Sequence, residues 1–242
     1  MTALREEIAV CCKKLRLRQL TDHIDSIETQ DREQFLLELL QKEVRNRETS
    51  RIDRSIKQAG FYTRKLLDDF IFDEVSLPGS LTVAQLTGLQ FIEDRQNLIL
   101  YGNVGTGKTH LATALGIKAC REGKRVAFWR TAALVNHLTR LAEGGEQESF
   151  LQKLEKLDLL ICDEWGYVPL HRDGARLLFQ VISLCYEKKS MILTTNVEFS
   201  KWANIFFDEM MTTAIIDRLV HHSHLIMFEG ESRRVMNSLM RN

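Results

Sequence analysis

The clearest chemical signal of this chain is a glycine-rich stretch, ILYGNVGTGKTHLA, at residues 99–112. Its core fits the pattern G-x-x-x-x-G-K-[ST], in which glycines let successive backbone N–H groups point at phosphate oxygens. Lys108 is predicted to reach the β- and γ-phosphates of a nucleotide, and the Thr109 hydroxyl is predicted to ligate Mg²⁺. The residues predicted to form this phosphate loop are Gly102, Asn103, Val104, Gly105, Thr106 and Gly107, followed by Lys108 and Thr109.

Two adjacent carboxylates follow an apolar run in LDLLICDEWGY, residues 157–167. The pattern places Asp163 and Glu164 at the carboxyl end of a buried strand, where ligands bind in open α/β sheets. Asp163 suits the Mg²⁺ shell, because Mg²⁺ prefers oxygen ligands. Glu164 suits the activation of a water for attack on a γ-phosphorus. The plainer interpretation is a surface turn that carries two acids.

Two further polar residues are candidates for the same site. Asn196 ends the apolar run SMILTTN and is predicted to orient the attacking water or contact the γ-phosphate. Asn at a strand exit is commonly only a turn residue. Arg218, in AIIDRLV, is predicted to be an arginine finger that one subunit supplies to its neighbour. Its alternative role is an ion pair with Asp217 or another acid.

Other residues with reactive or aromatic side chains give weaker signals. His221, His222 and His224 have no cysteine or carboxylate at ligand spacing, so we expect a loop rather than a metal site. The five cysteines lack a paired C-x-x-C spacing, which favours reduced, buried thiols. Trp165 and Tyr167 follow the two carboxylates, where they would either face DNA or pack between helices.

The elements that must position these residues alternate along the chain. Short apolar strands are predicted at 97–101, 125–129, 158–162, 190–195 and 224–228, with helices that include 108–121, 172–187 and 210–220. Such alternation predicts an α/β fold, with a five-stranded parallel sheet covered by helices on both faces. Residues 131–156 are long enough for two helices between the second and third of these strands.

The N-terminal part of the chain has a different pattern. Residues 3–59 are almost free of Gly and Pro and carry apolar residues at helical spacing, so we expect a helical domain over 1–65. A connector at 66–85 contains the break SLPGSLT, and the ATPase domain is expected over 86–242. Residues 42–65 hold eight basic and three acidic side chains, an arrangement that suits either DNA phosphates or a solvated helix face.

Bulk properties bound the class of protein. The 242 residues are 44% hydrophobic and carry 33 basic and 33 acidic side chains, so overall charge neither indicates nor excludes a nucleic-acid partner. No run of about 18 apolar residues is present, and the N-terminus lacks the apolar core of a signal peptide. These features predict a cytoplasmic globular protein.

The motifs together narrow the class of nucleotide-binding protein. N-K-x-D, which a GTPase uses to read guanine, is absent, and so is the LSGGQ signature of transporter ATPases. The set of polar residues that is present resembles that of the AAA+ ATPases. It consists of the adjacent Asp163 and Glu164, the strand-end Asn196 and the downstream Arg218. The chain also resembles the IstB family of insertion-sequence ATP-binding proteins, a family that is similar to DnaC, the helicase loader. The motifs that carry this resemblance are GNVGTGKTHLA, DLLICDEWGYVPL, TTN, DRL and GES-x-R. The N-terminal LLELLQKEVRNRETSRIDRSIKQAGF also resembles that family's helical extension.

The resemblance implies an ATP- and Mg²⁺-dependent protein that forms an oligomer on DNA, mainly through backbone contacts, and recruits the transposase encoded beside it. It implies an AAA+ phosphate-loop domain. The chain departs from the AAA+ pattern in that only 14 residues follow Phe228, too few for the common three-helix lid, so we expect a reduced C-terminal lid. Arg234 matches the family's Ser-x-Arg and would contact the nucleotide, with Arg233 as an adjacent alternative.

Two other functions remain open from the sequence. A DnaC-like protein would load a replicative helicase and use ATP as a switch. A non-catalytic interaction protein would work mainly through its N-terminal helices, although the adjacent Asp163 and Glu164 argue against that.

Overall fold

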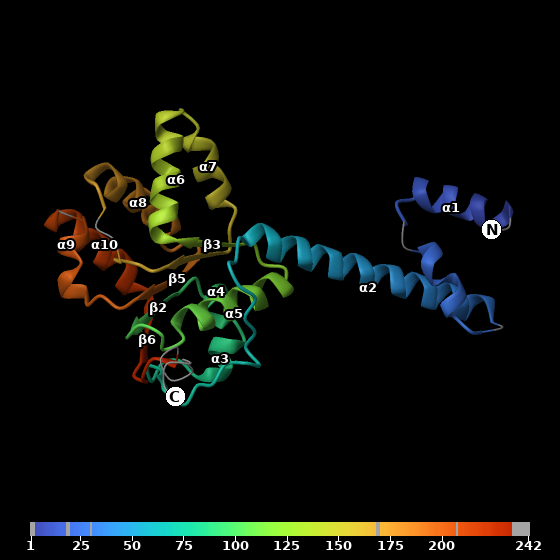
Figure 1. Ribbon diagram of the computed structural model, residues 1–242, viewed down its shortest axis with the longest axis horizontal. Helices are drawn as coiled ribbons and strands as arrows, with labels where there is room; N and C mark the ends of the chain where they lie inside the picture. The colour runs from blue at the N-terminus through green and yellow to red at the C-terminus, as the bar shows by residue number, and fades with distance from the viewer. Residues whose placement is uncertain (1–2, 18–19, 30, 168–169, 207, 234–242) are drawn as a thin grey trace, which may run out of the picture. The chain divides into compact units, whose positions relative to one another are not determined.

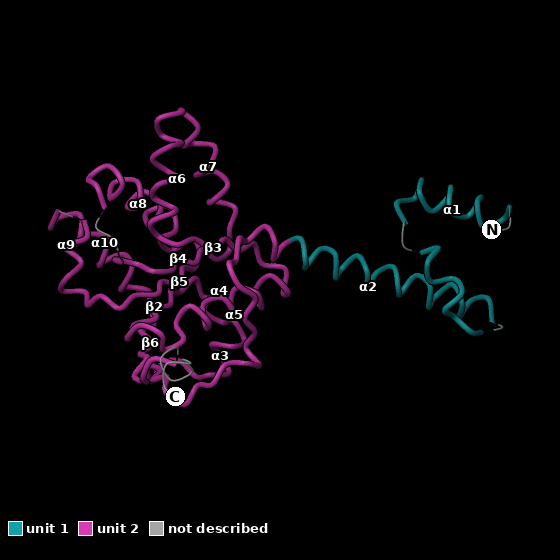
Figure 2. Tube along the Cα trace, in the orientation of Figure 1, with its two compact units in different colours: residues 1–54 teal, residues 55–242 magenta. Residues whose placement is uncertain are grey.

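The structure is a computed structural model that describes residues 3–17, 20–29, 31–167, 170–206 and 208–233 (Figure 1). Its residues form two compact units, Met1–Arg54 and Ser55–Asn242 (Figure 2). Because this division follows contacts between residues, it does not test the domain boundaries expected at 65 and 85, which remain a prediction. None of the helices in the described part of the chain has the length and apolar character needed to cross a lipid bilayer.

The second unit is built on a six-stranded sheet in the order β1-β6-β2-β5-β4-β3. The five parallel strands are β2 (Asn97–Gly102), β3 (Val126–Arg130), β4 (Leu159–Asp163), β5 (Ser190–Thr195) and β6 (Ser223–Phe228), and each boundary lies within one residue of its predicted position. The sixth strand, β1 (Val75–Ser76), pairs antiparallel with β6 at the edge. Two residues are too few for a periodic pattern, so the sequence did not predict this strand.

Helices cover both faces of the sheet, and alternate strand residues point into the two layers. One apolar cluster includes Leu98 and Leu100 of β2; the other includes Ile99 between them. The first layer holds α3 (Val83–Thr87), α4 (Gln90–Glu93) and α5 (Lys108–Arg121). The second layer holds α6 (Thr131–Glu143), α7 (Gln147–Glu155), α8 (Arg172–Cys185), α9 (Ala203–Phe206) and α10 (Glu209–His221). A short 3-10 helix, η2 (Phe199–Lys201), directly precedes α9. The two helices expected in 131–156 are α6 and α7.

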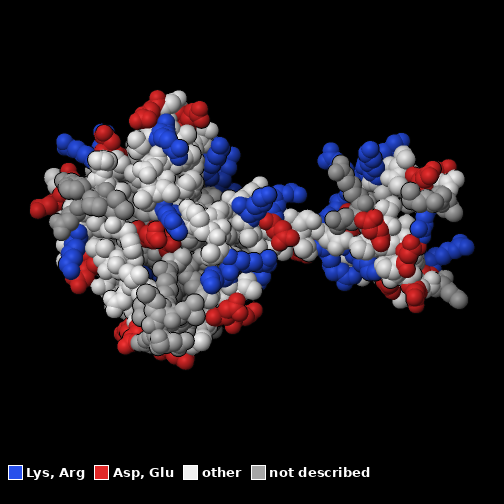
Figure 3. All heavy atoms as spheres, in the orientation of Figure 1, with Lys and Arg blue, Asp and Glu red and all other residues white. Residues whose placement is uncertain are grey.

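The first unit is helical, as predicted. It contains α1 (Ala3–Lys14), the 3-10 helix η1 (Leu20–Ser26) and most of α2 (Arg32–Ala59). Its small core is formed by Cys12, Leu20 and Leu39. On α2, Arg47 pairs with Glu43 at 2.7 Å and Arg51 with Glu48 at 3.8 Å. These pairs partly neutralise the basic stretch within the helix. Basic and acidic side chains both appear on the visible surface (Figure 3).

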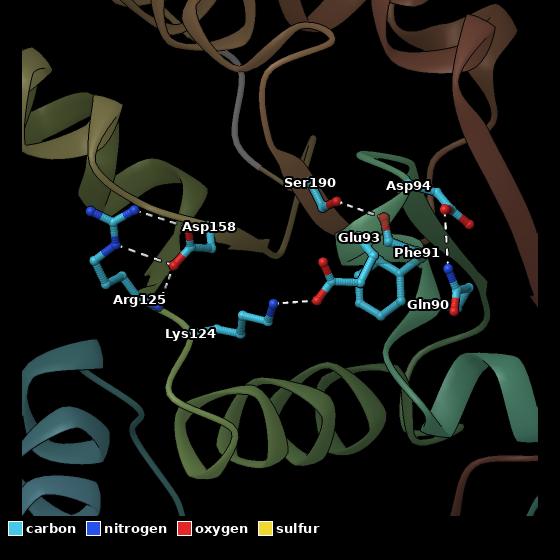
Figure 4. Close-up of polar contacts among 8 residues, drawn as sticks. All are labelled: Gln90, Phe91, Glu93, Asp94, Lys124, Arg125, Asp158 and Ser190. Atoms are coloured by element: carbon cyan, nitrogen blue, oxygen red, sulfur yellow. Dashed lines mark hydrogen bonds and ion pairs between the residues drawn. The ribbon is translucent and has the colours of Figure 1, made fainter.

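Polar contacts fix the amino ends of the strands (Figure 4). Just before β3, Arg125 donates from its backbone N to Asp158 Oδ2 at 2.7 Å and from its guanidinium to both carboxylate oxygens. Burial raises the pKa of Asp158, but the hydrogen bonds from Arg125 outweigh burial and the pKa lies below its usual value. In the same region Lys124 pairs with Glu93, and the Ser190 hydroxyl donates to the Phe91 carbonyl at 2.9 Å. The functional residues lie at the opposite, carboxyl ends of the strands.

Candidate nucleotide-binding site

The phosphate loop lies between β2 and α5, as the sequence predicts. Gly105 and Gly107 have φ values of +85° and +107°, in the left-handed region that favours glycine. The Lys108 ammonium is almost fully buried and donates to the carbonyls of Gly102 at 2.8 Å and Asn103 at 2.6 Å. The lysine therefore folds back across its own loop. Because α5 begins at Lys108, its N-terminal N–H groups are directed at the same place.

The segment after β6 contacts the phosphate loop. A Cβ atom on Gly105 would lie 2.1 Å from Ser232 Oγ, and Arg233 N donates to the Gly105 carbonyl at 3.1 Å. The Arg233 guanidinium also pairs with Glu74 at 3.4 Å. Arg234, the residue predicted to contact the nucleotide, lies outside the described residues. Its neighbour Arg233 lines the cavity at the loop.

Asp163 and Thr109 meet as predicted for a metal-binding pair. Thr109 Oγ1 donates to Asp163 Oδ1 at 2.9 Å, and Thr194 Oγ1 of β5 donates to the same oxygen at 2.5 Å. The Asp163 side chain is buried, with 3% of its surface exposed. A buried carboxylate beside a hydroxyl is a set of hard oxygen donors, so these residues fit Mg²⁺. The sequence indicated Thr194 only as part of the TTN triplet, although the parallel pairing of β4 and β5 makes its contact with Asp163 direct.

Glu164 has an unusual backbone conformation beside this pair. Its φ is +59°, a left-handed value that is uncommon for a residue other than glycine. Its N–H donates to Thr194 Oγ1 at 3.0 Å, and its carboxylate pairs with Arg130 at 3.5 Å. The Arg130 guanidinium also lies 4.5 Å from the centre of the Tyr62 ring. Sequence reasoning missed Arg130, but it ends β3 exactly as Asp163 ends the neighbouring β4, so the strand alignment was a usable signal.

A cavity of about 620 Å³ opens over these groups, which is in the size range of small-molecule sites. Its lining includes residues of the phosphate loop, Asp163, Glu164 and Thr194. Further lining residues come from the segment that follows α2, and sequence reasoning did not assign them. They are Tyr62, Thr63, Lys65 and Phe70. Phe70 packs edge-on against His110 of α5, with ring centres 5.3 Å apart.

Asn196 and Arg218 are not brought to this cavity in one copy of the chain. Asn196 is exposed just beyond the end of β5 and is not among the residues that line the cavity. Arg218, on α10, donates to Ser183 Oγ of α8 and lies 4.5 Å from the centre of the Phe179 ring. The alternative partner of Arg218, Asp217, is exposed. The roles of Asn196 and Arg218 in turnover stay predictions.

The two aromatic residues after Glu164 separate in the structure. Trp165 is fully buried, with its ring centre 5.5 Å from that of Trp202 and 5.9 Å from that of Phe206. Tyr167 is 43% exposed and lines the cavity. Trp165 is therefore a packing residue, whereas Tyr167 is accessible.

A phosphate loop at the first parallel strand, a carboxylate–hydroxyl pair at the end of β4 and this strand order define an AAA+ phosphate-loop domain. A family model described as "IstB-like ATP binding protein" matches residues 11–240, nearly the whole chain. The chain therefore belongs to the family of IstB-like ATP-binding proteins.

Curated relatives agree with this assignment. A protein of insertion sequence IS21 from Pseudomonas aeruginosa, whose name describes ATP binding, is 37% identical over 95% of this chain and 89% of its own length. A similarly named protein of insertion sequence IS232 from Bacillus thuringiensis subsp. berliner is 33% identical over 95% of this chain and 94% of its own length.

Solved structures show the same fold at lower identity. The replication initiator DnaA, bound to AMPPCP and single-stranded DNA, has a TM-score of 0.57 and 21% identity, over 71% of this chain and 52% of its own. The DnaC helicase loader has a TM-score of 0.51 and 22% identity, over 61% of this chain and 92% of its own.

Proposed function

We propose that this protein is a Mg²⁺-dependent ATPase that assembles on DNA and recruits or stimulates the transposase of its insertion sequence. The observation that carries the proposal is the grouping of Thr109, Asp163 and Glu164 in one cavity with the residues of the phosphate loop. Membership of a family of insertion-sequence ATP-binding proteins supports the link to transposition.

The residues of the site have separate tasks in this proposal. The loop N–H groups and Lys108 bind phosphate oxygens, and Thr109 and Asp163 hold Mg²⁺, which supplies charge neutralisation when it is bound. Glu164 takes a proton from the attacking water. Glu164 also pairs with Arg130 at 3.5 Å, and in this proposal that ion pair opens before the carboxylate accepts a proton. Asn196 orients the water.

The position of Arg218 supports self-association. Arg218 belongs to α10, and its guanidinium packs against Phe179 and Ser183 of α8. Arg218 is not among the residues that line the cavity of its own chain. In the proposed oligomer it stabilises γ-phosphate charge in the site of a neighbouring copy. Basic side chains of α2, such as Arg54, contact DNA phosphates, mainly without reading bases.

The proposal is tested by ATP turnover per subunit as protein concentration is raised, with and without DNA. We expect turnover per subunit to rise with concentration and DNA to move the rise to lower concentration, because DNA gathers copies together. Turnover per subunit that stays constant down to dilute protein would contradict a shared site. Raised salt is a useful second condition, since phosphate contacts weaken steeply with salt.

A second candidate, a helicase loader, is favoured only by the fold of DnaC. The two functions differ in their partner. Pull-down with the transposase encoded beside this protein, in the presence of ATP and DNA, should recover a complex. Recovery of the replicative helicase instead would support the loader, and ATP binding without any turnover would favour a non-catalytic interaction protein.

A further inference from the structure

The end of α8 and the end of α10 bring together three metal-ligating side chains that lie far from the nucleotide cavity. They are Glu187, His221 and His222, and their ligating atoms all lie within 4.8 Å of one another. His222 Nε2 is 3.1 Å from Glu187 Oε1. The sequence pattern around the histidines showed no acidic partner, because Glu187 is 34 residues before His221 and reaches it only through the packing of the two helices.

The backbone on both sides of this cluster is held in place. After α8, Lys188 and Lys189 donate to the Cys185 carbonyl at 3.0 and 3.1 Å, which fixes the turn that carries Glu187. Glu187 itself has a left-handed φ of +54°. On the other side, Asn97 at the start of β2 donates to the His222 carbonyl at 2.7 Å. Helices α8 and α10 contact each other directly (Figure 1).

The backbones are fixed, and the side chains are partly exposed while in contact with one another: the His221 and His222 ring centres lie 4.4 Å apart, and His221 Nδ1 lies 3.5 Å from the Tyr186 hydroxyl. The Glu187 side chain is 56% exposed and the His222 side chain 39% exposed. Tetrahedral ligation at about 2.0 Å separates ligand atoms by roughly 3.3 Å. The His222–Glu187 distance already matches that spacing, and rotation of the exposed side chains brings the third atom into range. The C-terminal end of α10 adds a partial negative charge, which favours a cation.

We propose that Glu187, His221 and His222 bind one divalent transition-metal ion of the zinc type, with water completing its coordination. Two imidazoles and one carboxylate form a ligand set that zinc accepts when one position stays open, and that excludes Mg²⁺ in favour of borderline metals. The alternative is a solvent-exposed ion pair between His222 and Glu187, which needs no metal.

Occupation of the site would clamp the end of α10 to the end of α8. Arg218 lies one turn before His221 on α10, and its guanidinium rests on Phe179 and Ser183 of α8. The ion would therefore stabilise the same helix contact that holds Arg218. Metal binding at Glu187, His221 and His222 does not depend on a catalytic role of Arg218. The proposed metal site and the proposed ATPase function can therefore be refuted independently of each other.

The test is titration of untagged, full-length protein with Zn²⁺ in competition with a chromophoric chelator. Every sample carries Cys11→Ser, because an exposed thiol such as Cys11 is a competing type of zinc ligand. We expect one ion per chain, a higher unfolding temperature with Zn²⁺, and affinity at least about tenfold lower after His222→Ala or Glu187→Gln. Bound Co²⁺ should give a visible absorption spectrum typical of a four- or five-coordinate ion.

His224→Ala is the matched control, because His224 belongs to the same sequence cluster but hydrogen-bonds Gln96 at 2.8 Å and not the proposed ligands. Binding should be unchanged in this variant. Circular dichroism confirms that each variant is folded, and Glu187→Gln preserves the side-chain shape. No binding at about 100 μM Zn²⁺, or equal binding by the His222→Ala and His224→Ala proteins, would overturn the proposal.

Discussion

At the scale of single residues, Glu164 combines a strained backbone with an ion pair to Arg130. A left-handed conformation costs a residue with a side chain about 1 kcal/mol or more, and it persists only where the surroundings impose it. The hydrogen bond from its N–H to Thr194 Oγ1 is one such constraint. Glu164 keeps this conformation at a position where it lines the cavity, which is where the proposed water attack takes place.

Gly105 supports a prediction about ATP affinity. Gly105→Ala would place a methyl group against Ser232 Oγ and strain a left-handed backbone at the same time. The loop N–H groups would then no longer converge on phosphate, so we expect ATP binding at least about tenfold weaker. Binding of a fluorescent ATP analogue measures this effect.

Two other glycines serve as controls that separate the effect of the close contact with Ser232 from the effect of backbone strain. Gly145 has a similar left-handed φ of +72° but nothing within 4 Å of an added Cβ atom, and Gly79 has open space without a left-handed φ. Gly145→Ala should lower stability by about 1 kcal/mol and leave ATP binding intact, whereas Gly79→Ala should change neither. ATP binding by Gly105→Ala that matches either control would show that the loop tolerates a side chain.

At the scale of elements, the two ends of the parallel strands differ in their contacts. The carboxyl ends of β4 and β5 carry Asp163 and Thr194, which line the cavity. The amino ends of β3 and β4 are joined by the contacts of Arg125 with Asp158. Asp158 lies just before β4, so its hydrogen bonds tie the start of β4 to the start of β3. We infer that this contact sets the alignment of the two strands whose other ends carry Arg130 and Asp163.

Asp158→Asn should lower the free energy of unfolding by about 1–2 kcal/mol near neutral pH, because it removes charge-assisted hydrogen bonds from Arg125. The pKa of Asp158 is depressed in the folded protein, so the wild-type contact stabilises the fold above the unfolded pKa of about 3.9. That contribution is lost as pH falls through the lower, folded pKa. Urea unfolding of both proteins between pH 3 and pH 7 measures the difference.

The expected result is a stability difference that shrinks toward acid pH. Glu143→Gln, at an exposed position at the end of α6, is the control and should stay within about 0.5 kcal/mol of wild type at every pH. A difference between Asp158→Asn and wild type that is constant with pH would mean that the charge of Asp158 does not stabilise the fold.

At the scale of the whole molecule, one copy of the chain holds an incomplete set of the predicted catalytic groups. Glu164 lines the cavity, but Arg218 contacts α8 and is not among the cavity residues. A site shared between copies would make assembly a condition of turnover. It would also allow DNA to control ATP use, by controlling how many copies meet.

Mixing two inactive variants tests this sharing. Glu164→Gln lacks the base but keeps Arg218, and Arg218→Ala keeps the base but lacks the finger. In an equal, random mixture about a quarter of the shared sites would contain both groups, so about a quarter of wild-type turnover should return. Each variant alone should bind ATP with near wild-type affinity and stay inactive. A mixture as inactive as its components would place Arg218 outside the sites of neighbouring copies.

The sequence predicted the parts of this molecule that have local patterns. Apolar strands, the phosphate loop and the Asp163–Glu164 pair are each encoded in a few consecutive residues, and all appear where expected. The presence of Tyr62 and Phe70 in the cavity lining depends on contacts between distant segments. These two residues repeat no pattern, so only the folded arrangement reveals them. Arg130 directly follows a predicted strand, which was a signal that sequence reasoning did not use. The short β1 was missed because its two residues are too few for a periodic pattern.

The burial of Trp165 gives this protein an internal optical reporter. The chain has three tryptophans, and two of them adjoin the Arg130–Glu164 ion pair in sequence: Trp129 precedes Arg130 and Trp165 follows Glu164. Trp165 is fully buried, with its ring tilted at 41° to that of Trp202, while Trp129 is only partly buried. We expect rupture of the ion pair to change the surroundings of these indoles. The wild-type chain can therefore be followed in real time by its own fluorescence, without any attached dye.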